Sequence, residues 1–128
     1  MPESPPRPTD AELEILTVLW SLGPSTVREV HEAISRRKPA QYSTVLKFLQ
    51  IMAEKGLARR NEKQRAHVYE AARPREWTQR QLAGDLLERA FSGSAKSLMV
   101  GALSARKASK EDLAELRRLL DEYEKRTR

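Results

Sequence analysis

Four polar residues share one side of a predicted helix near the middle of the chain. At about 100° per residue, the segment from Ala40 to Lys55 separates into an apolar side and a polar side. The polar side offers short hydrogen-bonding groups and one cation, namely Ser43, Thr44, Lys47 and Gln50. Such groups bond to base edges when a helix lies in the major groove of DNA. A helix whose polar side only faces water has the same pattern, so the flanking segments must decide.

The segment after this helix has the pattern of a basic β-hairpin. Residues 57–60 and 66–71 are rich in Val, Tyr and Leu relative to their flanks, and they predict two short strands around a polar tip. The hairpin contains four cations, Arg59, Arg60, Lys63 and Arg65. These side chains can reach phosphates or the minor groove, which adds affinity with little sequence information. His67 could also donate to a phosphate, although a packed, hydrogen-bonded histidine fits the pattern as well.

Two further predicted helices precede these segments. Thr9 and Glu12 fit a capping box ahead of apolar residues at helical spacing, and this helix runs to about Leu22. Gly23-Pro24 ends it, and Ser25 is expected to cap the second helix. His31 is expected to be structural or exposed. We expect Trp20 and Phe48 in the core because each sits in an apolar helical stripe.

The order helix, helix, helix, basic hairpin is that of a winged helix-turn-helix domain. The distribution of charge along the chain supports this assignment. Residues 1–35 contain two basic and six acidic side chains, whereas residues 36–65 contain nine basic and two acidic ones, within a net charge of +6. We therefore expect a mainly α fold with a small β-hairpin, in which residues 1–8 are a disordered arm, 9–73 the winged domain and 74–128 a helical domain.

The helical domain is expected to hold two copies of the chain together. Helices are predicted from about Trp77 to Phe91, from Ala95 to Leu103 and after Ser109 as a cap. Three short helices cannot bury all of their apolar side chains alone. The residues expected at the dimer interface are Leu82, Leu86, Leu98, Leu113, Leu116 and Leu120.

Several function classes fit the sequence poorly. The chain has no cysteine and two histidines, so it offers no thiol chemistry and no obvious metal site. It also lacks a glycine-rich phosphate loop or a pairing of nucleophile and base, which argues against an enzyme. No apolar run is suited to a secretory signal or a membrane span. We expect a cytoplasmic protein without cofactor, metal or direct membrane insertion.

Several motifs resemble the penicillinase-repressor family of the BlaI, MecI and CopY type. The resemblance extends over about 115 of the 128 residues. Its motifs are Leu13-Glu14-Ile15-Leu16 leading to Trp20, Ser25-Thr26-Val27-Arg28-Glu29-Val30, Tyr42-Ser43-Thr44-Val45, Gly56-Leu57, Arg65-Ala66-His67-Val68-Tyr69 and Phe91-Ser92-Gly93-Ser94-Ala95-Lys96-Ser97-Leu98. The order of these motifs is more specific than any one of them.

The resemblance implies a homodimeric transcriptional repressor on a palindromic operator. Transferred by position, Ser43, Thr44 and Lys47 would read bases, with Gln41 as a flanking candidate. In the family, a membrane sensor-protease signal leads to cleavage of an Asn-Phe bond in the dimerisation region. This chain has Gly101-Ala102 there, and it also lacks the cysteine cluster of copper-responsive members. A winged-helix regulator released from DNA by a small-molecule ligand is the alternative.

Overall fold

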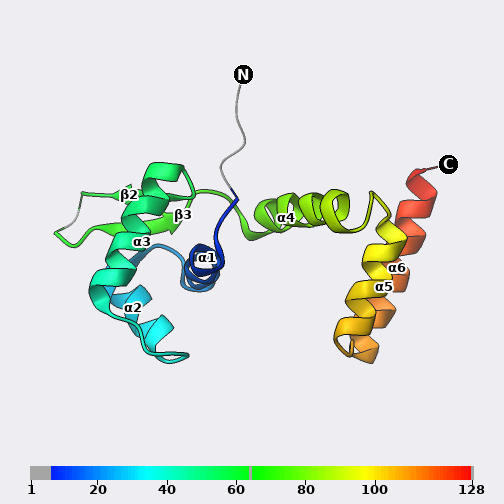
Figure 1. Cartoon of the computed structure of the whole chain (residues 1–128), viewed down its shortest axis with the longest axis horizontal. Helices are drawn as coiled ribbons and strands as arrows, with labels where there is room; N and C mark the ends of the chain where they lie inside the picture. Colours follow the sequence, from blue (N-terminus) through cyan, green and yellow to red (C-terminus); the bar gives the residue numbers. More distant parts are fainter. Residues whose placement is uncertain (1–6, 64, 128) are drawn as a thin grey trace, which may run out of the picture. The chain divides into compact units, whose positions relative to one another are not determined.

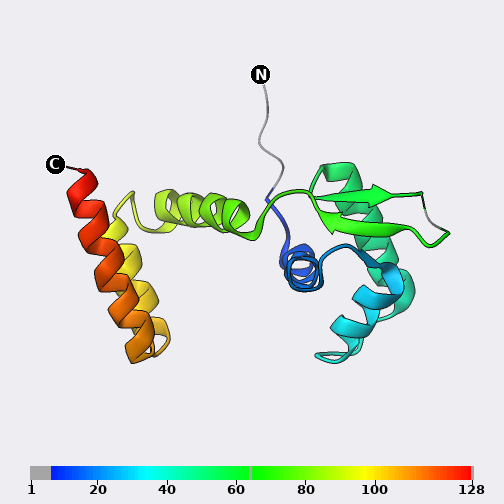
Figure 2. The same cartoon turned by 180° about the vertical axis from the view of Figure 1, so that it is seen from behind.

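The computed structural model describes residues 7–63 and 65–127, and within them it has six helices and one three-stranded antiparallel sheet (Figure 1, and from behind in Figure 2). The predicted fold class is confirmed. The chain forms two compact units, one ending at Leu82 and one beginning at Ala83. The predicted arm at residues 1–8 lies outside the described residues except for Arg7 and Pro8. Among the described residues, no helix has the length and apolar character needed to cross a membrane.

Capping boxes start the first two helices. In α1 (Asp10–Leu22), the Thr9 hydroxyl accepts from the Glu12 amide at 3.2 Å while the Glu12 carboxylate accepts from the Thr9 amide at 2.9 Å, as predicted. The predicted Ser25 cap of α2 (Val27–Ser35) was wrong, because Thr26 has the glutamate three residues later that a capping box requires. Thr26 caps the helix together with Glu29.

The sheet has one strand more than the predicted hairpin. Strand β1 (Ser25–Thr26) pairs with β3 (Val68–Ala71), which also pairs with β2 (Ala58–Asn61), so the order is β1-β3-β2. Tyr69 in the central strand lies opposite Ser25 on one side and Arg60 on the other. The sheet therefore fixes the start of α2 next to the wing, which is the loop between β2 and β3.

Helix α3 (Tyr42–Lys55) is held by the core of the first unit. Val45, Leu49 and Met52 are buried along one side of it, and they pack with apolar residues of α1, α2 and β2. Trp20 and Phe48 pack against this core as predicted, and both are partly buried. The helix ends at Gly56, whose φ of 84° is a left-handed conformation that suits glycine.

The second unit contains the end of α4 (Arg75–Ala90), α5 (Ala95–Ala105) and α6 (Lys110–Arg126). Ser109 caps α6 as predicted, its hydroxyl accepting from the Asp112 amide at 3.0 Å. Among the described residues from 83 to 127, no side chain is buried. The predicted boundary after residue 73 precedes α4, whereas the two units divide within that helix.

Candidate nucleic-acid interface

The polar side of α3 is exposed and its orientation is fixed. Ser43, Lys47 and Gln50 are all exposed, whereas Leu49 and Met52 on the other side of the helix are fully buried. Rotation of α3 about its axis would expose that apolar side to water, which is unfavourable. The core therefore holds three hydrogen-bonding side chains toward solvent in one orientation, as a groove-reading helix requires.

Gln41 and Thr44 lie on a different flank of α3. Both are exposed, and both line a cavity of about 310 Å³ toward α1 and the turn between α2 and α3. Glu14 and Lys38 at this cavity form an ion pair at 3.4 Å. Ser43 and Lys47 therefore share the exposed polar face of α3. Gln41 and Thr44, the other two residues predicted to read bases, lie at the edge of this face.

The four cations of the hairpin do not form one cluster. Arg59 and Arg60 are neighbours in β2, so their side chains point to opposite faces of the sheet. Arg60 forms an ion pair with Glu62 and lines a surface hollow with Gln50. A second hollow is lined by Arg59, Arg60 and Lys63 together with Glu62 and Glu70. Arg65 instead faces α2 and α3.

His31 connects α2 to the start of α3. Its Nε2 lies 2.8 Å from the Ala40 carbonyl oxygen, to which it donates, and its ring contacts the Tyr42 ring edge-to-face with centroids 5.7 Å apart. These contacts connect α2 to the turn before α3. Tyr42 lies at the start of α3 against this histidine and is 48% exposed.

Glu12 connects α1 to the other end of α3. Its carboxylate is buried and accepts two hydrogen bonds from the Lys55 ammonium, at 2.9 and 3.1 Å. Burial raises the pKa of Glu12, but hydrogen bonds from Thr9 and the charge and hydrogen bonds of Lys55 outweigh this effect, so the pKa lies below its ordinary value. The sequence predicted the capping role of Glu12 but not this ion pair.

Comparison with known proteins decides the family. A family model described as penicillinase repressor matches residues 8–122. The chain belongs to the penicillinase repressor family. A transcriptional regulator BlaI of Mycobacterium tuberculosis (strain CDC 1551 / Oshkosh) is 38% identical over 117 residues, which are 90% of this chain and 83% of the relative. A penicillinase repressor of Bacillus licheniformis is 25% identical over 121 residues, 94% of each chain.

A solved structure adds a spatial match within the penicillinase repressor family. It is the solution structure of the monomeric form of Bacillus licheniformis BlaI in complex with the blaP half-operator, which is 25% identical with a TM-score of 0.50. The match covers 57% of this chain and 89% of that one. These comparisons confirm the expected resemblance and the expected class, a DNA-binding transcriptional repressor and not an enzyme.

Proposed function

We propose that α3 reads base edges of an operator and that the wing binds its backbone. The base-reading residues are Ser43, Thr44 and Lys47, with Gln41 at the flank. The phosphate-binding residues are Arg59, Arg60, Lys63 and Arg65. The observation that supports this proposal most is the exposed polar face of α3, held in one orientation by buried Leu49 and Met52. The half-operator bound to the Bacillus licheniformis relative supports duplex DNA as the partner.

We propose that the chain acts as a homodimer on a palindromic operator. Residues 9–73 would bind DNA and residues 74–128 would form the dimer. The absence of buried side chains from 83 to 127, within the part of the chain that the structure describes, supports this division. Helices without fully buried apolar side chains gain little stability from their own packing, so a second copy would supply the missing core. The interface would contain Leu82, Leu86, Leu98, Leu113, Leu116 and Leu120.

Release from DNA would require separation of the two copies. A membrane sensor-protease that acts on the repressor in the cytoplasm is the partner we propose for this step. The bond between Gly101 and Ala102 lies inside α5, so cleavage there would also require local opening of the helix.

The function is tested by protection of the promoters in the chain's own gene neighbourhood. We expect a protected palindrome, and we expect Lys47→Ala to weaken binding to it. The matched control is Arg80→Ala, which removes one exposed cation from α4. Equal losses for the two variants would show that Lys47 acts only through net charge. Protection of no specific sequence by the wild-type chain would contradict the proposed function.

A further inference from the structure

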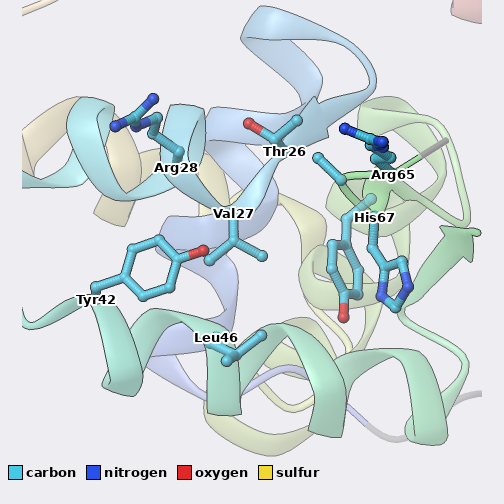
Figure 3. Close-up of a pocket in the computed structure, with 9 residues that line it drawn as sticks. Thr26, Val27, Arg28, Tyr42, Leu46, Arg65 and His67 are labelled. Carbon is cyan, nitrogen blue, oxygen red and sulfur yellow. The ribbon is translucent and has the colours of Figure 1, made fainter.

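A cavity of about 560 Å³ lies where the starts of α2 and α3 meet the loop before β3 (Figure 3). Its polar lining comes from three separate elements. Thr26 and Arg28 belong to the start of α2, Tyr42 to the start of α3, and Arg65 and His67 to the wing. Figure 3 shows Arg28 on one side of the space, Arg65 and His67 on the other, and the Tyr42 hydroxyl directed between them.

The chemistry of this lining suits an anion. The two guanidinium groups donate several hydrogen bonds each, and the hydroxyl and imidazole groups add further donors. None of the described residues that line the cavity is acidic. The amino-terminal end of α2 adds a positive helix dipole, since α2 begins at Val27 in the cavity wall. Groups that can donate to a phosphate oxygen thus come from α2, α3 and the wing, and they alternate with the apolar Val27, Leu46 and Ala66.

A second observation points to a ligand. Tyr69 also lines the cavity, and its hydroxyl is buried with no hydrogen-bond partner among the described residues. Burying a hydroxyl without a partner is unfavourable by about 1 to 3 kcal/mol. The residue is held rigidly, because it lies in the central strand between Ser25 and Arg60. Because almost no surface of this hydroxyl is accessible, a bound oxygen can reach the unused donor only when the cavity wall shifts.

The position of the cavity relative to α3 identifies the source of the anion. Tyr42 and Leu46 line it, and at about 100° per residue they occupy the flank of α3 next to Ser43 and Gln50. A helix that reads the major groove lies between two phosphate backbones. We propose that this cavity binds one backbone phosphate of the operator, held by Arg28, Arg65, His67 and the Tyr42 and Tyr69 hydroxyls. The proposal rests on the proposed function and extends the interface to α2.

The first test measures affinity and its salt dependence. Wild-type protein and the variants Arg28→Gln and His67→Gln are titrated, by fluorescence anisotropy, against a duplex selected from a random pool and against a random duplex. We expect Arg28→Gln to weaken binding to both duplexes by about tenfold, as for loss of a hydrogen bond to a charged group. The slope of log affinity against log salt should fall by about 1. The control variant is Arg80→Gln, which removes an exposed arginine outside the cavity. It should change neither the affinity nor the salt slope strongly.

Tyr69→Phe separates ligand binding from a structural role. Because the hydroxyl has no partner in the free protein, its removal should leave the unfolding midpoint unchanged or raised. Affinity for DNA should nevertheless fall. A lower midpoint with unchanged DNA affinity would show that the hydroxyl serves the fold, and would contradict its assignment to the cavity.

Neutral phosphate analogues distinguish the two sources of phosphate. The selected duplex is prepared with one methylphosphonate at a time, which removes one backbone charge. We expect one position per half-site at which the methylphosphonate weakens binding of the wild-type chain. At that position the substitution should not weaken binding of the Arg28→Gln variant any further. Inorganic phosphate is then titrated into the DNA-free protein while the His67 resonances are followed. Response to inorganic phosphate without any such duplex position would overturn the proposal in favour of a site for a small anion.

Failure of this inference differs from failure of the proposed function. If the wild-type chain does not distinguish the selected duplex from the random one, the proposed function is wrong. If it does distinguish them but Arg28→Gln and His67→Gln bind both duplexes as the wild type does, only the phosphate cavity is wrong.

Discussion

Thr44 and Lys47 are both exposed on α3, but the two side chains have different chemistry. A threonine hydroxyl or methyl group can distinguish bases, whereas a lysine contributes mostly charge. We predict that Thr44→Ala lowers discrimination at one base position per half-site by about 1 to 3 kcal/mol. Competition with duplexes that carry single base changes measures this loss. An equal loss on random DNA would show instead that Thr44 contacts only the backbone.

The ion pair between Glu12 and Lys55 predicts a pH-dependent contribution to stability. Lys55→Met removes the hydrogen bonds to a buried carboxylate and should lower the free energy of unfolding at pH 7 by about 2 kcal/mol. Because the folded pKa of Glu12 is lowered, its stabilising effect is present above the unfolded pKa and is lost as the pH falls through the folded pKa. Urea unfolding at a series of pH values should show the difference between wild type and Lys55→Met shrinking in acid. A difference that stays constant with pH would contradict this role.

The sequence predicted which residues share one face of a helix. It did not predict which residues from distant segments would contact each other. The exposed face with Ser43 and Lys47 follows from a period of about 3.6 residues. Glu12 and Lys55 are 43 positions apart, and His31 contacts a carbonyl nine positions away. No spacing rule links such pairs, because the packing of α1 and α2 on α3 brings them together.

At the scale of elements, Gly56 determines how α3 leads into the wing. Its φ of 84° is strained for a residue with a side chain, so Gly56→Ala should lower the free energy of unfolding by about 1 kcal/mol. Gly84 is the matched control, because it lies inside α4 with no heavy atom within 4 Å of an added Cβ. Gly84→Ala should raise stability by up to about 1 kcal/mol through helix propensity. Thermal unfolding of both variants measures these changes. Equal changes in stability would contradict the claim that the turn at residue 56 requires glycine.

Helix α5 contains Gly101-Ala102, the bond that we expect at the position of the family's Asn-Phe cleavage site. Neither Gly101 nor Ala102 offers the amide or aromatic side chain of an Asn-Phe bond. Loss of the aromatic contact would cost about 3 kcal/mol, roughly a hundredfold in rate. We predict that a sensor-protease that requires Asn-Phe does not cut this chain. Coexpression followed by mass analysis of fragments tests this, and a cut between residues 101 and 102 would contradict it.

Helices were predictable to within two residues where their caps are local. Thr9 and Ser109 each bond to an amide three positions later, so they could be recognised in the sequence. Strand β1 was missed because two residues give no alternation pattern, and its pairing with Val68 and Tyr69 depends on a chain reversal through α2 and α3. Strand pairing is a tertiary property, so β1 could not be predicted from its own residues.

At the scale of the whole molecule, the two units differ in how they are stabilised. The first has a buried core. Trp20 Nε1 donates at 2.9 Å to the carbonyl of Arg73, just before α4, and Thr78 within α4 is buried. A chain that ends at Leu82 should therefore fold. We predict that it sediments as a monomer and binds operator much more weakly than the full chain. A dimer of this shortened chain would place the interface in the first unit.

Composition predicts a partner copy, but it does not predict how that copy would dock. Leucines at helical spacing outnumber the positions that three short helices can bury, and Leu120 is 61% exposed in the single chain. Which of these side chains meet across a two-fold axis depends on a second copy whose docking no residue pattern specifies.

The most direct test of the account measures the stoichiometry and specificity of DNA binding together. The full chain is sedimented with a fluorescent palindromic duplex, recovered by selection from a random pool, and with a random duplex of equal length at the same salt concentration. We predict two protomers on each palindrome, with affinity about a thousandfold or more above that for the random duplex. Equal affinity for both duplexes would contradict sequence-specific repression, and a single protomer bound tightly to the palindrome would contradict the dimer.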